Sequence, residues 1–504
     1  MPRHLAPGVY IEEITSKAHA IERASTSTTA FVGITQRNSL AADRFDPDKV
    51  TAFTSFRDYL GRFGPVLSSG DDMGLAVQAF FLNGGDRCYV FPLSNNSSTA
   101  SVLLGGMRIT ANGDGPWGNR LYVRISETDQ ESAVFNLEIG TRNNTGVFYA
   151  NEKYASLSLQ ASSENFVGNV LSRQSALVSA DIDDTSTLPQ ATDIEGIALQ
   201  GGSQSSPSPS DFRDFYNRSL IKVQDVSIIV LPGQVWAADG SGNEIISATL
   251  THCDDTQSSV VIIDLPKDAE LTNARHVERM ALPASSYSVL YYPWVGMNNS
   301  LYSSSANPTI SKKIYLAPSA IAAGMWAKID KQRGVWKTPA GIEAQLTGSV
   351  SLRFRVDSHV QEEISPPGIN CIRDMGLRVG RVLWGARTLA NTRGIDMRYI
   401  AVRRTTIMIK ESIDNGTDWV IFEPNDPRLW SSLKSSIENF LFELFRSGAL
   451  QGAKAEEAYF VHCGLGDTMT QSDLDNMRVV VNVGFALLKP AEFTVIKIEK
   501  RAGV

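Results

Sequence analysis

The sequence has little cysteine and no long apolar run. Its 504 residues include four scattered cysteines, Cys88, Cys253, Cys371 and Cys463. This spacing gives no disulfide framework and fits a reducing compartment. No apolar run approaches the roughly 18 residues that a membrane-spanning helix needs, so we expect no membrane insertion. Arg3 and His4 are not followed by an apolar stretch, and we expect no signal peptide.

Basic residues are in the minority. Lys and Arg number 47 against 54 Asp and Glu, which gives a formal net charge of −7. A chain with this balance lacks the overall charge of a nucleic-acid binder. Apolar residues make up 42% and charged residues 20%, as in globular proteins. The length allows about three domains.

Motifs that carry catalysis are absent or out of context. The stretch GDGPWG (113–118) fits G-x-G-x-x-G, but strand-like NRLYVRI follows it where a dinucleotide fold needs a helix N-terminus. A β-turn is therefore favoured. The sequence contains neither a G-x-x-x-x-G-K-[ST] loop nor a G-x-S-x-G elbow. We expect a protein that is not an enzyme.

Two His–Cys pairs and one acidic loop are the other candidates for chemistry. His252–Cys253 and His462–Cys463 lack the spacing of zinc ligands, and inert buried cysteines are favoured. A Cys–His pair assembled by the fold stays open. DIDDTST (181–187) begins like a calcium loop but lacks the glycine at position 6 and the glutamate at position 12. We expect no metal and no cofactor.

A strand pattern stands near each end of the chain. LAPGVYIEEI (5–14) alternates in part, and a polar stretch follows it; AEFTVIKIEK (491–500) is the second strand. A strand cannot stand alone, because its N–H and C=O groups need partners. Each terminal strand must therefore join a sheet.

The middle of the chain predicts an α/β region with an all-β insertion. VSIIVLPG, SSVVIIDLP and YSVLYYPW are apolar strands separated by helices near 243–253 and 268–280, which indicates a sheet covered on both faces. Helices are also predicted at 55–64, with Ser55 as N-cap, at 72–85 and at 318–330. Residues 94–206 are rich in Ser, Thr, Asn and Gly with short alternating runs, typical of β structure.

The last third contains the clearest helix and a run of arginines. The helix covers 427–447, with Asp426 as N-cap and one apolar stripe. Between residues 373 and 404 there are eight arginines, opposed only by Asp374 and Asp396. They can pair with carboxylates across an interface or within the C-terminal domain, and both alternatives stay open. No stacking aromatics interleave with them, which disfavours nucleic-acid binding.

Several stretches, in order, resemble the sheath proteins of contractile tails and injection systems. PGVYIEEI (7–14) resembles the family's N-terminal arm, and PWGNRLYVRI (116–125) the start of its inserted β domain. YYPW (291–294) with APSAIAAGMWAKIDKQRGVWKTPAG (317–341) resembles its central signature. VLWGARTLA, RYIAVRRTTIMIKESI and WVIFEPND resemble its C-terminal core. The ordered set carries the resemblance, since no single motif is chemically diagnostic.

The resemblance implies a multidomain α+β or α/β fold with a central α/β sheet domain. The implied parts are an N-terminal arm and linker (1–25), a central α/β domain (26–93 and 207–345), an inserted β-rich outer domain (94–206), a C-terminal tube-facing domain (346–488) and a C-terminal arm (489–504). In such sheaths both arms complete a β-sheet in the C-terminal domains of neighbouring subunits. The implied arm residues are Val9, Tyr10, Ile11, Ile14, Phe493, Val495, Ile496 and Ile498.

The resemblance also implies function and partners. The chain is expected to polymerise helically with itself around an inner tube and to contract, driving the tube through a target membrane. Other implied partners are baseplate and terminal cap proteins, with no direct nucleic-acid contact. Arg403 and Arg404, beside the predicted strand RYIAV (398–402), are candidates for lattice salt bridges. Candidates for tube contact are Lys434, Glu438 and Glu443.

Several alternatives stay open. A single chain with both arms does not resemble the two-protein sheath of type VI secretion. The short length and lean insertion favour a phage-derived injection particle, with a contractile phage tail as the alternative. Either would be assembled in the bacterial cytoplasm, and the particle could be released from the cell. More distant alternatives are an α/β enzyme with a β insertion and a surface adhesin or receptor-binding module.

Overall fold

The computed structural model describes most of the chain in two compact units. The described residues are 20–37, 52–66, 69–93, 95–142, 146–299, 311–390, 397–488 and 493–501, the last range by its backbone. The larger unit is Ser25–Arg404, and the smaller unit joins Met1–Ala24 to Thr405–Val504. The predicted N-terminal arm, with Val9, Tyr10, Ile11 and Ile14, lies outside the described residues.

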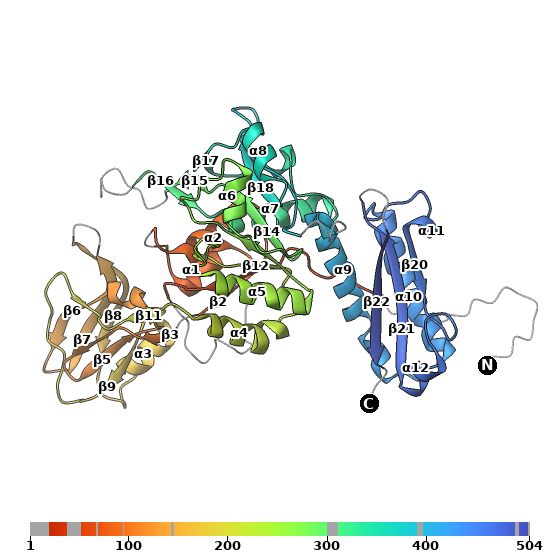
Figure 1. Cartoon of the computed structure of the whole chain (residues 1–504). Coiled ribbons are helices and arrows are strands. Elements are labelled where there is room, and N and C mark those ends of the chain that lie inside the picture. The colour runs from red at the N-terminus through yellow and green to blue at the C-terminus, as the bar shows by residue number, and fades with distance from the viewer. Residues whose placement is uncertain are drawn as a thin grey trace, which may run out of the picture. The chain divides into compact units, whose positions relative to one another are not determined.

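A seven-stranded sheet forms the centre of the larger unit (Figure 1). Its order is β19-β18-β14-β13-β12-β1-β2, and every neighbouring pair is parallel except β18 with β19. The strands are β1 (Thr29–Gly33), β2 (Cys88–Pro92), β12 (Ile228–Val230), β13 (Val260–Ile263), β14 (Ser288–Tyr292), β18 (Ile369–Asp374) and β19 (Arg381–Trp384). β1, β2, β12, β13 and β14 are buried along their whole length, as predicted for continuous apolar runs.

Helices cover this sheet. They are α1 (Phe56–Phe63), α2 (Asp72–Leu82), α4 (Pro209–Arg218), α5 (Asn243–Thr256), α6 (Ala274–Arg279), α7 (Pro318–Arg333) and α8 (Ser358–Ile364), with short 3-10 turns at Leu220–Lys222 and Ile342–Ala344. Ser55 caps α1 by accepting a hydrogen bond from the Asp58 amide, which confirms the predicted N-cap. α7 is buried around most of its circumference, because it packs on β12, β13 and β14 and also against α2.

The insertion forms its own β-rich body with one helix. It holds β3 (Asn95–Ser98), β4 (Ser101–Leu104), β5 (Met107–Ala111), a 3-10 turn (Pro116–Arg120), β6 (Leu121–Asp129), β7 (Val134–Arg142), β8 (Phe148–Leu157), α3 (Val167–Gln174), β9 (Val178–Ile182), β10 (Ile197–Ala198) and β11 (Ser203–Ser205). The sheets β10-β6-β7-β8 and β4-β5-β9 share one apolar core. GDGPWG leads through the 3-10 turn into β6, so it has no dinucleotide-binding helix.

The boundary of the predicted C-terminal domain needs correction. Residues 346–404 belong to the larger unit, because β18 and β19 extend its central sheet. β17 (Ser349–Leu352) pairs with β15 (Val295–Asn298), which also pairs with β16 (Lys313–Leu316). RYIAV is not a strand, since α9 (Ile400–Gly416) begins inside it. The apolar residues of this segment repeat with a helical period into TTIMIK, and this packing outweighs their local β-propensity.

The smaller unit packs helices on a three-stranded antiparallel sheet. After α9 it contains a 3-10 turn (Asp418–Phe422), α10 (Pro427–Arg446), α11 (Ala455–Ala458), β20 (Tyr459–His462), α12 (Gln471–Asp475), β21 (Arg478–Ala486) and β22 (Phe493–Arg501). The strand order is β20-β21-β22. Asp426 caps α10 by accepting from the Arg428 and Leu429 amides, which confirms the predicted start of this helix. None of the helices in the described ranges is long and apolar enough to cross a membrane.

The contact between α2 and α7 generates a prediction. A Cβ atom on Gly324 of α7 would lie 2.3 Å from the carbonyl oxygen of Phe80 on α2. Gly324→Ala should therefore lower the free energy of unfolding by about 1–3 kcal/mol, although alanine favours helices. Gly61→Ala is the control, because a Cβ on Gly61 of α1 has nothing within 4 Å. Urea unfolding that gives both variants the same stability would contradict this packing.

Candidate assembly site

The C-terminal strand is the first part of the candidate site. β22 pairs with β21 along nine residues, from Phe493 opposite Ala486 to Arg501 opposite Arg478. The predicted C-terminal arm residues Phe493, Val495, Ile496 and Ile498 all lie in this strand. Within the described ranges, β20 and β22 are the two edges of the sheet. An edge strand presents unpaired N–H and C=O groups to any strand that can add to it.

The described end of the N-terminal tether lies on the smaller unit. The amide of Ala24 donates to Ser412 Oγ on α9 at 2.8 Å, and Arg23 Nη2 donates to Ser447 Oγ at 2.8 Å. Ile21 lies directly over Gly416, where an added Cβ would be 2.8 Å from Ile21 Cγ1. The polar composition of this tether gave no sign of these contacts. Its only apolar anchor in the described part is one isoleucine without a periodic pattern.

A buried ion pair holds the two chain segments that pass from the larger to the smaller unit. Arg404 Nη1 and Nη2 donate to the two carboxylate oxygens of Asp330 on α7, at 3.1 and 2.5 Å. The side chains are 3% and 5% exposed. Arg404 Nη2 also donates to the carbonyl oxygen of Thr26 at 2.7 Å, and the Thr26 hydroxyl donates to Asp330 at 2.8 Å. Thr26 and Arg404 lie within two residues of the ends of the larger unit. The Asp330 carboxylate therefore holds the chain both where it enters and where it leaves this unit.

The surroundings of this pair explain its burial. The Arg404 guanidinium lies 4.6 Å from the ring centroid of Trp326, whose indole N–H donates to Tyr291 Oη at 3.0 Å. Burial raises the pKa of the Asp330 carboxyl, and Arg404 and the Thr26 hydroxyl counteract part of this rise. For Arg404, the structure therefore favours the intramolecular alternative over a lattice salt bridge.

Arg403 has a different environment. Its guanidinium donates to the hydroxyls of Ser286 and Tyr287 and lies 4.2 Å from the Tyr287 ring centroid. Burial lowers its pKa. Three further arginines of the run have partners in the larger unit: Arg381 pairs with Asp374 at 3.0 Å, and Arg387 and Arg398 donate to the carbonyls of Ser365 and Pro366. The run mainly ties the loops around β18 and β19 to each other.

The predicted tube-contact residues lie on the polar face of α10. Lys434 pairs with Glu438 at 3.8 Å, and Glu443 pairs with Arg446 at 3.6 Å. All four side chains are at least 41% exposed. The opposite face of α10 is core, as its apolar stripe predicts. The described surface of α10 therefore offers alternating charges of both signs to a partner.

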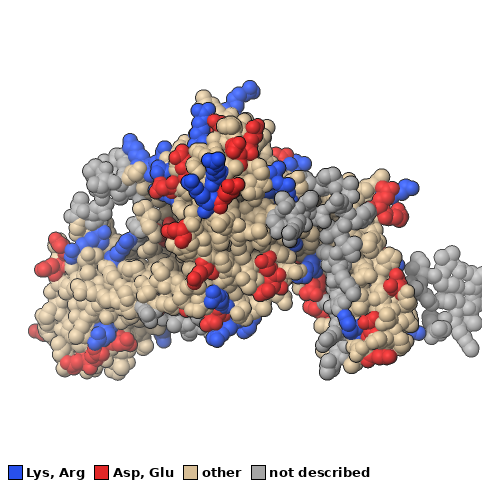
Figure 2. Space-filling model, in the orientation of Figure 1, with Lys and Arg blue, Asp and Glu red and all other residues tan. Residues whose placement is uncertain are grey.

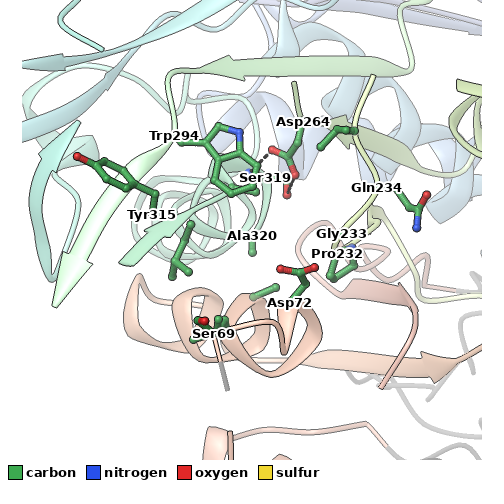
Figure 3. A pocket seen from close by; sticks show the side chains of 15 residues that line it. Ser69, Asp72, Pro232, Gly233, Gln234, Asp264, Trp294, Tyr315, Ser319 and Ala320 are labelled. Carbon is green, nitrogen blue, oxygen red and sulfur yellow. Dashed lines mark hydrogen bonds between the residues drawn. The ribbon is translucent and has the colours of Figure 1, made fainter. Parts of the chain in front are cut away.

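A small cavity at the carboxyl end of the parallel strands is where an α/β enzyme would place its chemistry (Figure 3). It has a volume of about 120 Å³. Asp264 follows β13 and accepts from the Ser319 amide and hydroxyl at 3.0 and 2.5 Å, so it caps the start of α7. Asp72, in the first turn of α2, lies across the cavity (Figure 3). These contacts tie β13 to the start of α7.

The other candidates for chemistry are structural in the described residues. Burial raises the pKa of Cys253 to about 12 and that of Cys463 to about 11, so both thiols stay protonated at neutral pH. Burial lowers the pKa of His252 to about 4, and its ring stacks on Tyr216. Within the described ranges, no group of three or more His, Cys, Asp or Glu side chains could hold a metal ion.

Asp264 generates a pH prediction. Burial raises its pKa from 3.8 to about 7, so between these values the folded carboxyl holds a proton that the unfolded one loses. The stability it contributes is complete below pH 4 and is lost as the pH rises through 7. Asp264→Asn should remove this dependence, which between pH 5 and 8 amounts to a loss of up to ~3 kcal/mol in the free energy of unfolding. Urea unfolding at both pH values tests this, and an unchanged slope in the variant would contradict it.

The Asp330–Arg404 pair generates a second prediction. Asp330→Ala leaves a buried guanidinium without its counter-ion, which should cost about 3–5 kcal/mol in unfolding free energy. Glu438→Ala removes one member of the exposed pair on α10 and should cost less than about 0.5 kcal/mol. Limited proteolysis should also cut faster near residues 20–26 in Asp330→Ala only. Equal costs for the two variants would contradict the proposed role of the buried pair.

Comparison with known proteins adds to this geometry. Residues 392–501 match the family model of the phage tail sheath C-terminal domain. A curated tail sheath protein of Burkholderia phage BcepMu is 30% identical over 145 residues, which are 27% of this chain and 30% of the phage protein. The matched part therefore spans less than a third of that relative.

Solved sheath structures share the fold over nearly the whole chain. The PVC sheath complex of an extracellular contractile injection system, in its contracted state, is 22% identical, with 99% of this chain and 98% of that chain covered and a TM-score of 0.58. The contracted helical sheath of the anti-feeding prophage is 23% identical, with 98% of this chain and 99% of that chain covered and a TM-score of 0.58. A sheath tail protein from Desulfitobacterium hafniense is 12% identical, with 98% of this chain and 100% of that chain covered and a TM-score of 0.64. The family model over residues 392–501 and the phage relative thus show that parts of this chain are similar to tail sheath proteins, and the solved structures show that the chain shares the fold of contractile sheaths.

Proposed function

We propose that this chain is the structural subunit of a contractile sheath. It polymerises helically around an inner tube and contracts to drive that tube through a target membrane. The observation that carries the proposal is the fold likeness to injection-system sheaths, which extends over at least 98% of both chains. The likeness to the PVC and anti-feeding prophage sheaths favours a phage-derived injection system. The phage relative keeps a contractile phage tail as the alternative.

Strand addition between copies is the proposed means of polymerisation. The described pairing of β22 with β21 consists of main-chain hydrogen bonds, and residues 489–492 between the two strands lie outside the described residues. A β22 strand from another copy could make the same bonds, because main-chain pairing in this register does not depend on which chain supplies the strand. The N-terminal arm, with Val9, Tyr10, Ile11 and Ile14, would add to a neighbour in the same manner. Such head-to-tail links do not close and so give an open helical polymer.

Contraction is proposed as a change between two packings of this lattice, without catalysis. A bistable packing releases energy when a barrier is removed, so no bound cofactor or nucleotide is required. The arms would keep copies joined while the folded units move. The buried Asp330–Arg404 pair would anchor the chain crossings in each copy under this load.

The remaining partners are proposals of the same kind. The polar face of α10, with Lys434, Glu438 and Glu443, is the proposed contact with the inner tube, and the insertion is the proposed outermost part. Baseplate and cap proteins would terminate the polymer at its ends. Assembly would take place in the bacterial cytoplasm, and the finished particle could be released from the cell.

The proposal predicts that the N-terminal arm is required for polymerisation but not for folding. Deleting residues 1–19 removes none of the described contacts, so the chain should stay folded and monomeric. Val9→Pro should have the same effect, because proline removes a strand hydrogen bond. Ala18→Pro, in the polar tether, is the matched control and should polymerise normally.

Negative-stain electron microscopy of the concentrated chain gives the measurement. The intact chain, alone or co-expressed with its tube and baseplate neighbours, should form hollow striated tubes. The two arm variants should form only dispersed particles with an unchanged circular dichroism spectrum. Dispersed particles from the intact chain under every condition, or tubes from the deletion variant, would overturn the proposal.

A further inference from the structure

Three cations surround one tyrosine on the small β16-β15-β17 sheet. The charged groups of Lys267, Lys313 and Arg353 lie 5.6, 5.8 and 5.4 Å from the ring centroid of Tyr315. All three are exposed, and Tyr315 is half-buried. We call these four residues the Tyr315 patch. Figure 2 shows Lys and Arg side chains gathered over this region, at the upper left of the larger unit.

The described neighbours of this patch neutralise only part of its charge. Asp268 pairs with Arg353 at 2.5 Å and remains 74% exposed. The described contacts of Lys267 and Lys313 are with the tyrosine ring. Such cation–π contacts orient an ammonium group without neutralising it. The Tyr315 patch therefore presents a net positive surface in a chain whose net charge is −7.

The negative charge of the chain is concentrated in the insertion. Residues 94–206 contain 12 acidic and 6 basic side chains, so they carry −6 of the chain's −7. Many of these acids lie at one end of the insertion, which we call the acidic tip. The tip residues are Glu127, Asp129, Glu131, Asp181, Asp183 and Asp184.

Hydrogen bonds bring the two halves of the acidic tip together. The Thr128 hydroxyl, in the end of β6, donates to the carbonyl oxygen of Pro189 at 2.7 Å. The Asp183 amide donates to the carbonyl oxygen of Gly106 at 2.8 Å, so the loop after β9 also meets the β4–β5 turn. Arg108 is the one tip cation, and it pairs with Asp183 at 3.2 Å. Hydroxyl hydrogen bonds lower the pKa of Asp129 and Asp184, so these groups stay ionised at neutral pH.

The tip lies at the end of the insertion that is far from its attachment. Arg37 of the larger unit's core donates to the carbonyls of Asn112 and Ala176, at the opposite ends of β5 and β9 from the tip. β6 runs nine residues from this base to the tip, or about 30 Å. An acidic group carried this far outward suits contact with another molecule.

We propose that the acidic tip of one copy docks on the Tyr315 patch of a neighbouring copy. This contact goes beyond strand addition but rests on the proposed polymerisation. It is heterologous, since patch and tip are different surfaces, and so it can repeat along an open helix. Each exposed charge pair contributes little alone, but complementary patches fix register and reject like-charged alignments. Screening by salt should weaken the contact.

Charge reversal tests this contact with matched controls. Lys267→Glu with Lys313→Glu reverses the patch, and Glu131→Lys with Asp181→Lys reverses the tip. At 0.1 M salt, each double variant should yield at least about tenfold less sedimentable polymer than the intact chain. The control for the patch variant is Lys222→Glu with Lys454→Glu, which lowers the net charge by the same amount at exposed sites elsewhere and should leave the yield within about twofold.

The decisive measurement is rescue. A mixture of patch-reversed and tip-reversed chains pairs each reversed surface with an opposite charge on another copy, so polymer yield should return. A chain carrying all four substitutions should also recover. Normal polymerisation of the patch-reversed chain would overturn the inference while leaving the proposed function intact. A loss that neither mixing nor the fourfold variant restores would overturn it in favour of another acidic partner, and failure of the intact chain to polymerise would count against the proposed function itself.

Discussion

The larger unit depends on the buried ion pair between Asp330 and Arg404. Removing two charges from water is costly, and here a bidentate geometry, the Thr26 backbone and hydroxyl, and the Trp326 ring together compensate for the loss. Asp330 stands near the end of α7, the helix that lies across the central strands. The same carboxylate therefore holds the core helix and both segments that lead to the smaller unit.

In the smaller unit, the candidate assembly site is the backbone of an edge strand and not a cluster of side chains. Within the described ranges its sheet has three strands, and one of the two edge strands, β22, is formed by the last described residues of the chain. α10 buries one face, while the charges on its other face stay exposed. Under the proposed function, this edge would join neighbouring copies through main-chain hydrogen bonds.

The central sheet shows why a fold by itself does not reveal function. Its carboxyl edge has a cavity, two helix N-termini and a carboxyl whose pKa burial raises to about 7, all features that active sites use. Yet Asp264 accepts both of its hydrogen bonds from Ser319 at the start of α7. The same edge that enzymes use for chemistry here fastens a strand to a helix. The position was predictable from the strand pattern, but its structural role was not.

The sequence alone determined those elements that depend on residues close together in the chain. The caps at Ser55 and Asp426, the buried parallel strands and the β-rich insertion all follow from side-chain spacing and backbone chemistry. Tertiary packing decided the rest. RYIAV became the start of α9, residues 346–404 joined the central sheet, and Arg404 turned inward to Asp330, because burial against distant residues outweighs local propensity. Likewise the acidic tip and the Tyr315 patch combine residues far apart in the chain, and only a folded structure brings such residues together.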